Sequence, residues 1–183
     1  PLRLLSVAGR RCEPSANRGP ARLAARLAPA GVEVVQEGVD LAAVEPFSED
    51  LEGSAGSGGE RFPAGAARLA ALVRSVDGVF IATPEYNGSV PGVLKNALDW
   101  MSQPDGARPE LTGLQASPTF GMPVAIASAS NGQFGAVWSR DELVKVIKTQ
   151  GGRAIAEPSV TVPKSFEAFD DDGDLRSSDL RAA

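Results

Sequence analysis

The stretch from residue 77 to residue 101 constrains the fold most, because it combines a buried strand, a tight turn and an amphipathic helix. Residues 77–82 form an apolar run bounded by turn residues, which predicts a strand buried on both faces, as in a parallel sheet. Asn87-Gly88 predicts a sharp turn after that strand. The next residues predict a helix, with Ser89 as its N-cap and Pro91 in its first turn. Apolar side chains then recur at helical spacing, at Val90, Val93, Leu94, Ala97, Leu98 and Met101.

Strands and helices alternate along the rest of the chain. Further apolar runs predict strands at 2–7, 32–35, 124–127 and 153–156. Amphipathic runs predict helices at 18–27, 65–75 and 136–149, the last of them ended by Gly151-Gly152. This alternation predicts a parallel sheet with right-handed crossovers. Because 43% of the 183 residues are hydrophobic, we expect one domain, residues 1–183, with one core.

Composition excludes several classes of function. The net charge of −5 argues against a nucleic-acid partner, which needs a concentrated basic patch. No apolar run approaches a membrane span and no leading segment resembles a signal peptide, so we expect no membrane partner and a cytoplasmic location. A single cysteine excludes an intramolecular disulfide. The absence of histidine excludes Ser-His-Asp and Cys-His catalysis and histidine metal sites. No metal site is predicted, and an enzymatic reaction would therefore need a cofactor.

One long motif resembles a known family. Residues 84–100 read Pro-Glu-Tyr-Asn-Gly-Ser-Val-Pro-Gly-Val-Leu-Lys-Asn-Ala-Leu-Asp-Trp and closely resemble the hallmark segment of the NAD(P)H-dependent FMN reductases, which include bacterial quinone, azo-dye and chromate reductases. The resemblance extends from the first strand to the acidic tail. It implies a flavodoxin-like α/β fold, a three-layer sandwich in which five parallel strands have the order 2-1-3-4-5. It also implies bound FMN and, usually, a homodimer or homotetramer.

The flavin ring is expected between two loops. In an open α/β sheet, ligands bind outside the carboxyl ends of the strands. The family likeness places the ring against the loop that follows strand 77–82, at Pro84, Glu85, Tyr86, Asn87, Gly88 and Ser89. The loop after strand 124–127 supplies the second wall, because small residues let the backbone approach closely and polar ones offer hydrogen bonds. Its expected contacts are Ser128, Ser130, Asn131 and Gly132. Either segment alone is equally consistent with an ordinary turn before a helix.

The flavin phosphate is expected in the loop after the first strand, since that loop enters a helix N-terminus and offers free N–H groups to an anion. It resembles the family pattern Gly-Ser-x-Arg-x-x-Ser-x-Asn at Gly9, Ser15 and Asn17. Arg10 replaces the first serine and Cys12 replaces the arginine, so Arg11 is the expected source of positive charge. Glu13 adds a negative charge where phosphate should lie. These departures from the pattern weaken the expectation of tight FMN binding.

The expected mechanism needs no catalytic side chain. NADPH or NADH passes a hydride to FMN and leaves, and a small-molecule acceptor then takes the electrons in a ping-pong sequence. The acceptors typical of the family are quinones, azo dyes, metal oxyanions and free flavin. The chain also contains two long connections, residues 36–64 and 102–121. Residues 36–64 are expected to be functional or disordered, and we expect residues 102–121 to lie near the ring site or to meet a partner subunit.

Two alternatives remain open at this stage. Cys12 and Arg18 have the spacing of the low-molecular-weight protein tyrosine phosphatase loop, and a cysteine at a helix N-terminus has a lowered pKa. That family's cysteine follows the strand directly, however, and its Asp-Pro general acid has no match here. The altered phosphate loop equally allows a non-catalytic flavodoxin-like binding or assembly module. The sequence does not decide whether Trp100 and Trp138 are core or interface residues.

Overall fold

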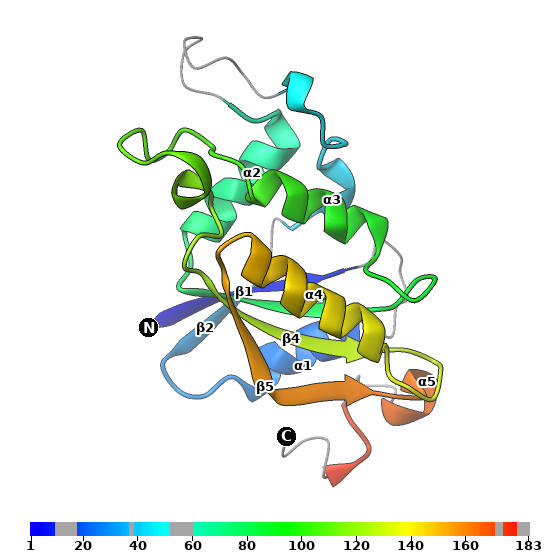
Figure 1. The fold of residues 1–183 in the computed structure, drawn as a ribbon. Coiled ribbons are helices and arrows are strands. Elements are labelled where there is room, and N and C mark those ends of the chain that lie inside the picture. The colour runs from blue at the N-terminus through cyan, green and yellow to red at the C-terminus, as the bar shows by residue number, and fades with distance from the viewer. Residues whose placement is uncertain (10–17, 37–38, 52–60, 171–173, 179–183) are drawn as a thin grey trace.

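The computed structural model describes residues 1–9, 18–36, 39–51, 61–170 and 174–178. At its centre, five parallel strands form one sheet with the order β2-β1-β3-β4-β5 (Figure 1). The strands are β1 (Leu2–Ala8), β2 (Val32–Val35), β3 (Gly78–Thr83), β4 (Pro123–Ala129) and β5 (Arg153–Val162). The predicted parallel sheet and its strand order are therefore confirmed.

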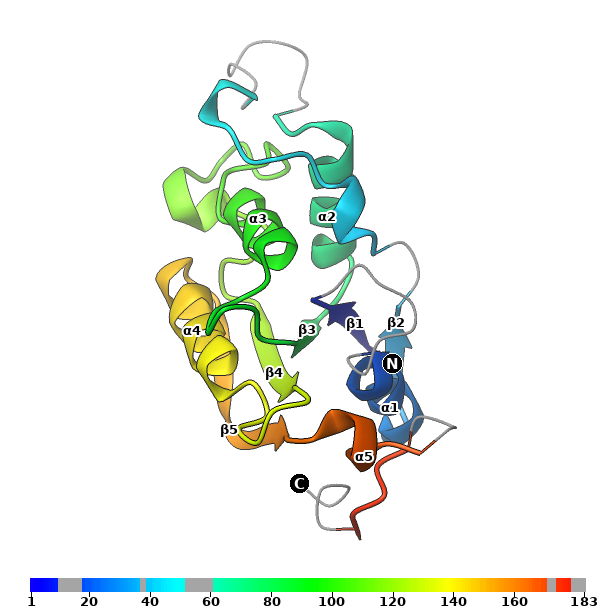
Figure 2. The same cartoon turned by 90° about the vertical axis from the view of Figure 1, so that its right-hand side faces the viewer.

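Helices cover both faces of the sheet. They are α1 (Arg18–Leu27), α2 (Ala64–Arg74), α3 (Gly92–Met101), α4 (Val137–Thr149) and the short α5 (Ser165–Ala168). Figure 2 shows α2, α3 and α4 on one face of the sheet, with α1 on the other. Three 3-10 helices lie in the connections, η1 (Leu41–Ala43), η2 (Glu49–Leu51) and η3 (Gly113–Ala116). The arrangement is the three-layer sandwich that the sequence predicted.

The fifth strand is longer than its apolar run suggests. Residues 153–156 were predicted, whereas β5 continues to Val162. Within that strand lies Pro158, which cannot donate to a ladder. The pairing of β4 with β5 shifts register between Ala125 and Ala127, and the strand resumes beyond the proline. An edge strand tolerates this because an irregular register leaves room for a residue without an N–H.

The main core lies between the sheet and helices α2, α3 and α4. The apolar face predicted for α3 is confirmed, since Leu94, Leu98 and Met101 are almost fully buried. From α4, Leu143 and Ile147 pack into the same cluster. Gly151 follows that helix with φ +78, and the N–H of Gly152 bonds the carbonyl of Ile147 at 2.9 Å, so the predicted glycine stop is also confirmed.

Residues 39–51, part of the first long connection, pack against α2 and α3. The indole N–H of Trp100 donates to the carbonyl oxygen of Glu45 at 2.7 Å, and the ring lies edge to face with Phe47 and Phe62. Trp100 is fully buried and is therefore a core residue. The carboxylate of Glu45 accepts hydrogen bonds from the backbone N–H groups of Gly65 and Ala66, at the start of α2.

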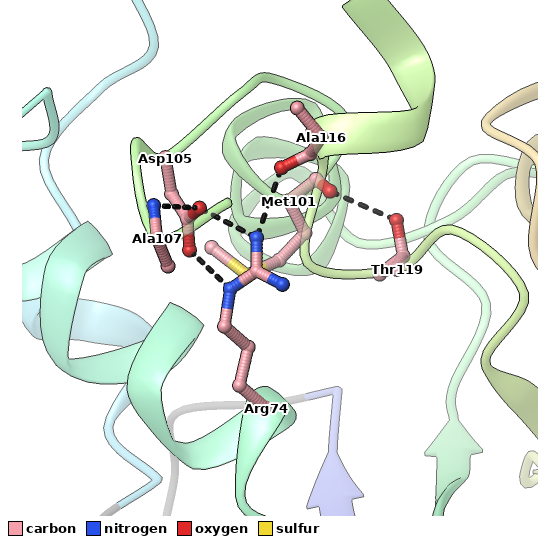
Figure 3. Close-up of polar contacts among 6 residues, drawn as sticks. All are labelled: Arg74, Met101, Asp105, Ala107, Ala116 and Thr119. Atoms are coloured by element: carbon pink, nitrogen blue, oxygen red, sulfur yellow. Dashed lines mark hydrogen bonds and ion pairs between the residues drawn. The ribbon is translucent and has the colours of Figure 1, made fainter. Parts of the chain in front are cut away.

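The second long connection does not lie near the predicted ring site, contrary to expectation. Figure 3 shows its attachment to the end of α2, where the Arg74 guanidinium donates to both carboxylate oxygens of Asp105, at 2.6 and 2.5 Å, and to the carbonyl of Ala116. The Thr119 hydroxyl donates to the carbonyl of Met101, at the end of α3. Because this loop joins the end of α3 to the start of β4, it lies at the amino edge of the sheet.

The Glu45 carboxylate yields a prediction about stability. We expect Glu45→Ala to lower the free energy of unfolding at pH 7 by about 1 kcal/mol, because two N–H groups at the start of α2 lose their acceptor. Urea unfolding measures this, with the exposed Glu49→Ala as the control.

The difference in unfolding free energy between the wild type and Glu45→Ala should depend on pH. Hydrogen bonds from its own N–H, and then from those of Gly65 and Ala66, lower the pKa of Glu45 from its ordinary value of 4.5 despite the opposing effect of burial. The stabilisation is therefore fully present above pH 4.5 and disappears as the pH falls through the lower pKa of the folded state. A stability difference that stays constant down to pH 3 would contradict this role.

Candidate functional site

Three loops begin at the carboxyl edge of the sheet, where β1, β3 and β4 end. They begin at Gly9, at Pro84 and at Ser130. Figure 2 looks onto this edge, with the ends of β3 and β4 between α1 and α4. The strands bring together predicted site residues from three separate parts of the sequence, which agrees with the rule that ligands bind outside the carboxyl ends of such sheets.

The loop after β3 forms a tight turn. Tyr86 and Ser89 exchange two backbone hydrogen bonds of 3.0 and 3.1 Å, while Asn87 and Gly88 have φ values of 53 and 73. This is the conformation in which Asn-Gly is favoured, so the predicted turn is confirmed. The N–H groups of Asn87 and Gly88 donate to no residue that the structure describes.

Glu85 connects this turn to another helix. One oxygen of its carboxylate accepts the backbone N–H groups of Trp138 and Ser139, at 3.1 and 3.2 Å, in the first turn of α4. The N-cap of that helix, Ala136, has φ 65 and no capping side chain. A carboxylate is favourable there because the helix N-terminus carries a partial positive charge. Glu85 therefore fixes α4 against the β3 loop.

Ser89 makes a second connection to α4, and the prediction that it caps α3 is wrong. The N-cap of α3 is Pro91, without a side-chain hydrogen bond, and the helix begins at Gly92. The Ser89 hydroxyl donates instead to the Glu142 carboxylate at 2.6 Å. This bond is the largest cause of the lowered pKa of Glu142. The hydroxyl of Ser89 thus bonds Glu142 on α4 and does not cap α3.

A third connection was missed by sequence reasoning. The hydroxyls of Thr83 and Ser139 lie 3.0 Å apart, and both residues are fully buried. Thr83 also donates to the carbonyl of Pro84. A threonine at the end of an apolar strand is the only local signal of this contact, because its partner lies far along the chain.

The loop after β4 is shaped by its own polar groups. Ser128 is fully buried, and its hydroxyl donates to the carbonyl of Gly135 at 2.7 Å. The side-chain oxygen of Asn131 accepts the hydroxyl of Ser165, whose N–H bonds the carbonyl of Ser130 at 2.9 Å. Ser128 and Asn131 therefore hold the loop in shape. Gly132 is exposed, and only the Ser130 hydroxyl lies near the position that a Cβ there would take.

The loop after β1 is described only at its start. Gly9 is buried, and its N–H bonds the carbonyl of Ala82 at 2.8 Å. A Cβ at this position would approach a methyl group of Leu94 to 2.9 Å, so a larger residue here would require the Leu94 side chain to shift. Three predicted phosphate contacts lie outside the described residues: Arg11, Ser15 and Asn17. The same is true of Cys12, the proposed phosphatase nucleophile.

Comparison with known proteins decides the family. The model of the NADPH-dependent FMN reductase family matches residues 2–167. This chain belongs to that family. An NAD(P)H-dependent FMN reductase of Pseudomonas aeruginosa is 31% identical over 180 residues, which cover 98% of this chain and 88% of that protein. A quinone reductase of Escherichia coli K12 is 37% identical over 134 residues, or 73% of this chain and 63% of that protein.

A 2-hydroxy-1,4-benzoquinone reductase of a Burkholderia species is 31% identical over 180 residues, covering 98% of this chain and 88% of that protein. Among solved structures, the flavoenzyme FerB of Paracoccus denitrificans has a TM-score of 0.80 at 24% identity, covering 99% of this chain and 92% of the other. A flavodoxin of Pseudomonas aeruginosa has a TM-score of 0.51 over 90% of this chain and 85% of the other. These structures share the fold.

The family membership confirms an oxidoreductase with FMN as its cofactor and NAD(P)H as its co-substrate, as the sequence predicted. It does not favour the phosphatase or the non-catalytic module. Within the part of the chain that the structure describes, no helix is both long enough and apolar enough to cross a membrane.

The Asn87 turn yields a prediction about flavin binding. We expect Asn87→Ala to weaken FMN binding by about tenfold, because alanine disfavours the left-handed conformation by roughly 1–2 kcal/mol. Asn87→Gly is the matched control, since it keeps the turn and should bind more tightly than the alanine variant. Quenching of flavin fluorescence measures both affinities. Equal affinities for the two variants would show that the turn conformation does not matter.

Proposed function

We propose that this protein binds FMN at the carboxyl edge of the sheet and transfers electrons from NAD(P)H to a quinone. The observation that carries the proposal is the pairing of two loops, after β3 and β4, that the Glu85 carboxylate holds through the first turn of α4. Relatives named for quinone reduction support the acceptor class.

The residues of this edge fit a flat ring. The turn at Asn87-Gly88 offers backbone N–H groups, and the exposed Gly132 leaves open space on the opposite loop. Gly9 lets the β1 loop approach β3 and α3 closely. We assign the ring edge to residues 84–89 and 130–132, and the phosphate to residues 9–17. When bound, FMN supplies a two-electron carrier that the side chains of the protein lack.

The protein's own contribution is orientation. The Glu85 carboxylate already accepts two N–H groups, so we assign it no proton transfer. Overall, NAD(P)H and one proton reduce the quinone to a hydroquinone and leave NAD(P)⁺, which balances two electrons. Donor and acceptor would use the same open edge in turn, as a ping-pong sequence requires. A homodimeric or homotetrameric state and a cytoplasmic location are further proposals, supported by the family likeness alone.

An absorbance spectrum of the purified protein with added FMN tests the proposal. We expect flavin bands that remain with the protein through gel filtration, bleach when NADPH or NADH is added under nitrogen, and return when benzoquinone is added. A correctly folded protein that neither retains FMN nor oxidises NAD(P)H in the presence of quinone would overturn the proposal and favour the non-catalytic module.

A further inference from the structure

Most of the exposed aromatic side chains that the structure describes lie in segments that follow the carboxyl end of a strand. In the described part of the chain, those that are at least 40% exposed are Tyr86, Phe120, Phe134, Trp138 and Phe166. All except Phe120 follow the carboxyl end of a strand, in the β3 loop, in the β4 loop and first turn of α4, and in α5. Exposed apolar clusters of this kind mark binding sites more often than chance exposure does.

Phe134 and Trp138 are in direct contact with each other. Their ring centroids lie 5.1 Å apart in an edge-to-face arrangement, although the two side chains are 55% and 51% exposed. The intervening Gly135 and Ala136 have φ values of 59 and 65, which turns the chain so that the two rings meet. The backbone N–H of Trp138 is one of the two that bond Glu85. The contact that aligns the two loops therefore also fixes this aromatic pair.

The position of Trp138 on α4 places it beside the β3 turn. Residues four apart in a helix share a face, so Trp138 lies one turn before Glu142 on the same face of α4. Glu142 accepts the hydroxyl of Ser89, at the end of the Tyr86–Ser89 turn. The backbone N–H of Trp138 bonds the carboxylate of Glu85, the residue before the half-exposed Tyr86 in the chain.

We propose that Phe134 and Trp138 form the acceptor-binding wall of the site and select planar conjugated acceptors, namely quinones, over small hydrophilic anions. This inference rests on the proposed function. A quinone would stack on the aromatic pair and bury apolar surface, whereas an anion would gain nothing from that wall. The nearby Arg140 is occupied by the Asp141 carboxylate at 2.7 Å. The reaction stays balanced as above, with two electrons and two protons added to the quinone.

We favour the electron acceptor over a second copy of the chain as the molecule that covers Phe134 and Trp138. The reason is that the two residues adjoin the segments to which we assign the flavin ring. The loop that carries Phe134 also carries Gly132, and the N–H of Trp138 shares its acceptor with that of Ser139 at the same edge. A subunit interface remains the competing occupant, and the test must separate the two.

The experiment compares kcat/KM for benzoquinone and for ferricyanide at saturating NADPH. We expect Phe134→Ala and Trp138→Ala each to lower kcat/KM for the quinone by about tenfold, mainly through KM, with ferricyanide turnover nearly unchanged. Trp138→Phe should recover most of the loss. Phe120→Ala is the matched control, because Phe120 is 40% exposed at the opposite edge, beside Gly151.

Each other outcome has a distinct meaning. Equal losses for both acceptors, or no loss for either, would overturn the aromatic-wall proposal while leaving the reductase intact. A lower mass for the variants by light scattering would assign the pair to a subunit interface and also overturn it. A wild-type protein that reduces neither acceptor would instead contradict the proposed function itself.

Discussion

The site depends on one carboxylate. Glu85 leaves the β3 loop and accepts two N–H groups from the first turn of α4, so that a residue from one loop caps the helix that follows another. Two further hydrogen bonds join this part of the chain to α4. One links the hydroxyl of Ser89 to the Glu142 carboxylate, and the other links the hydroxyls of Thr83 and Ser139. With these three contacts, the relative position of the two walls is set by the protein before any ligand arrives. Preorganisation of this kind reduces the ordering cost of binding.

The physical reason for this arrangement lies at the start of α4. Ala136 adopts a left-handed conformation and offers no side-chain oxygen, so the helix begins with N–H groups that lack a local acceptor. An ionised carboxylate is a strong acceptor for such groups, because charge-assisted hydrogen bonds add to the favourable helix dipole. Glu85 thus fixes the β3 loop to a helix that has no side-chain cap of its own.

Short-range patterns predicted much of this molecule. The Asn87-Gly88 turn and the buried face of α3 follow from residues that interact with close neighbours in sequence, whereas the strand order was expected from the family resemblance. The errors have a common cause, which is a distant partner. Ser89 is a good N-cap by composition, yet Glu142 captures its hydroxyl. The loop at 102–121 was placed near the ring site because its anchor, the Arg74 guanidinium, cannot be inferred from the loop itself.

Amide hydrogen exchange with and without FMN tests the location of the site most directly. We expect saturating FMN to slow exchange in peptides that cover residues 84–91 and 130–139, because we assign the flavin ring to these loops and Glu85 bonds the start of α4. Peptides from residues 102–121, anchored at the opposite edge by Arg74 and Asp105, should be unaffected. Protection confined to residues 102–121, with none at the carboxyl edge, would show that FMN does not bind at that edge.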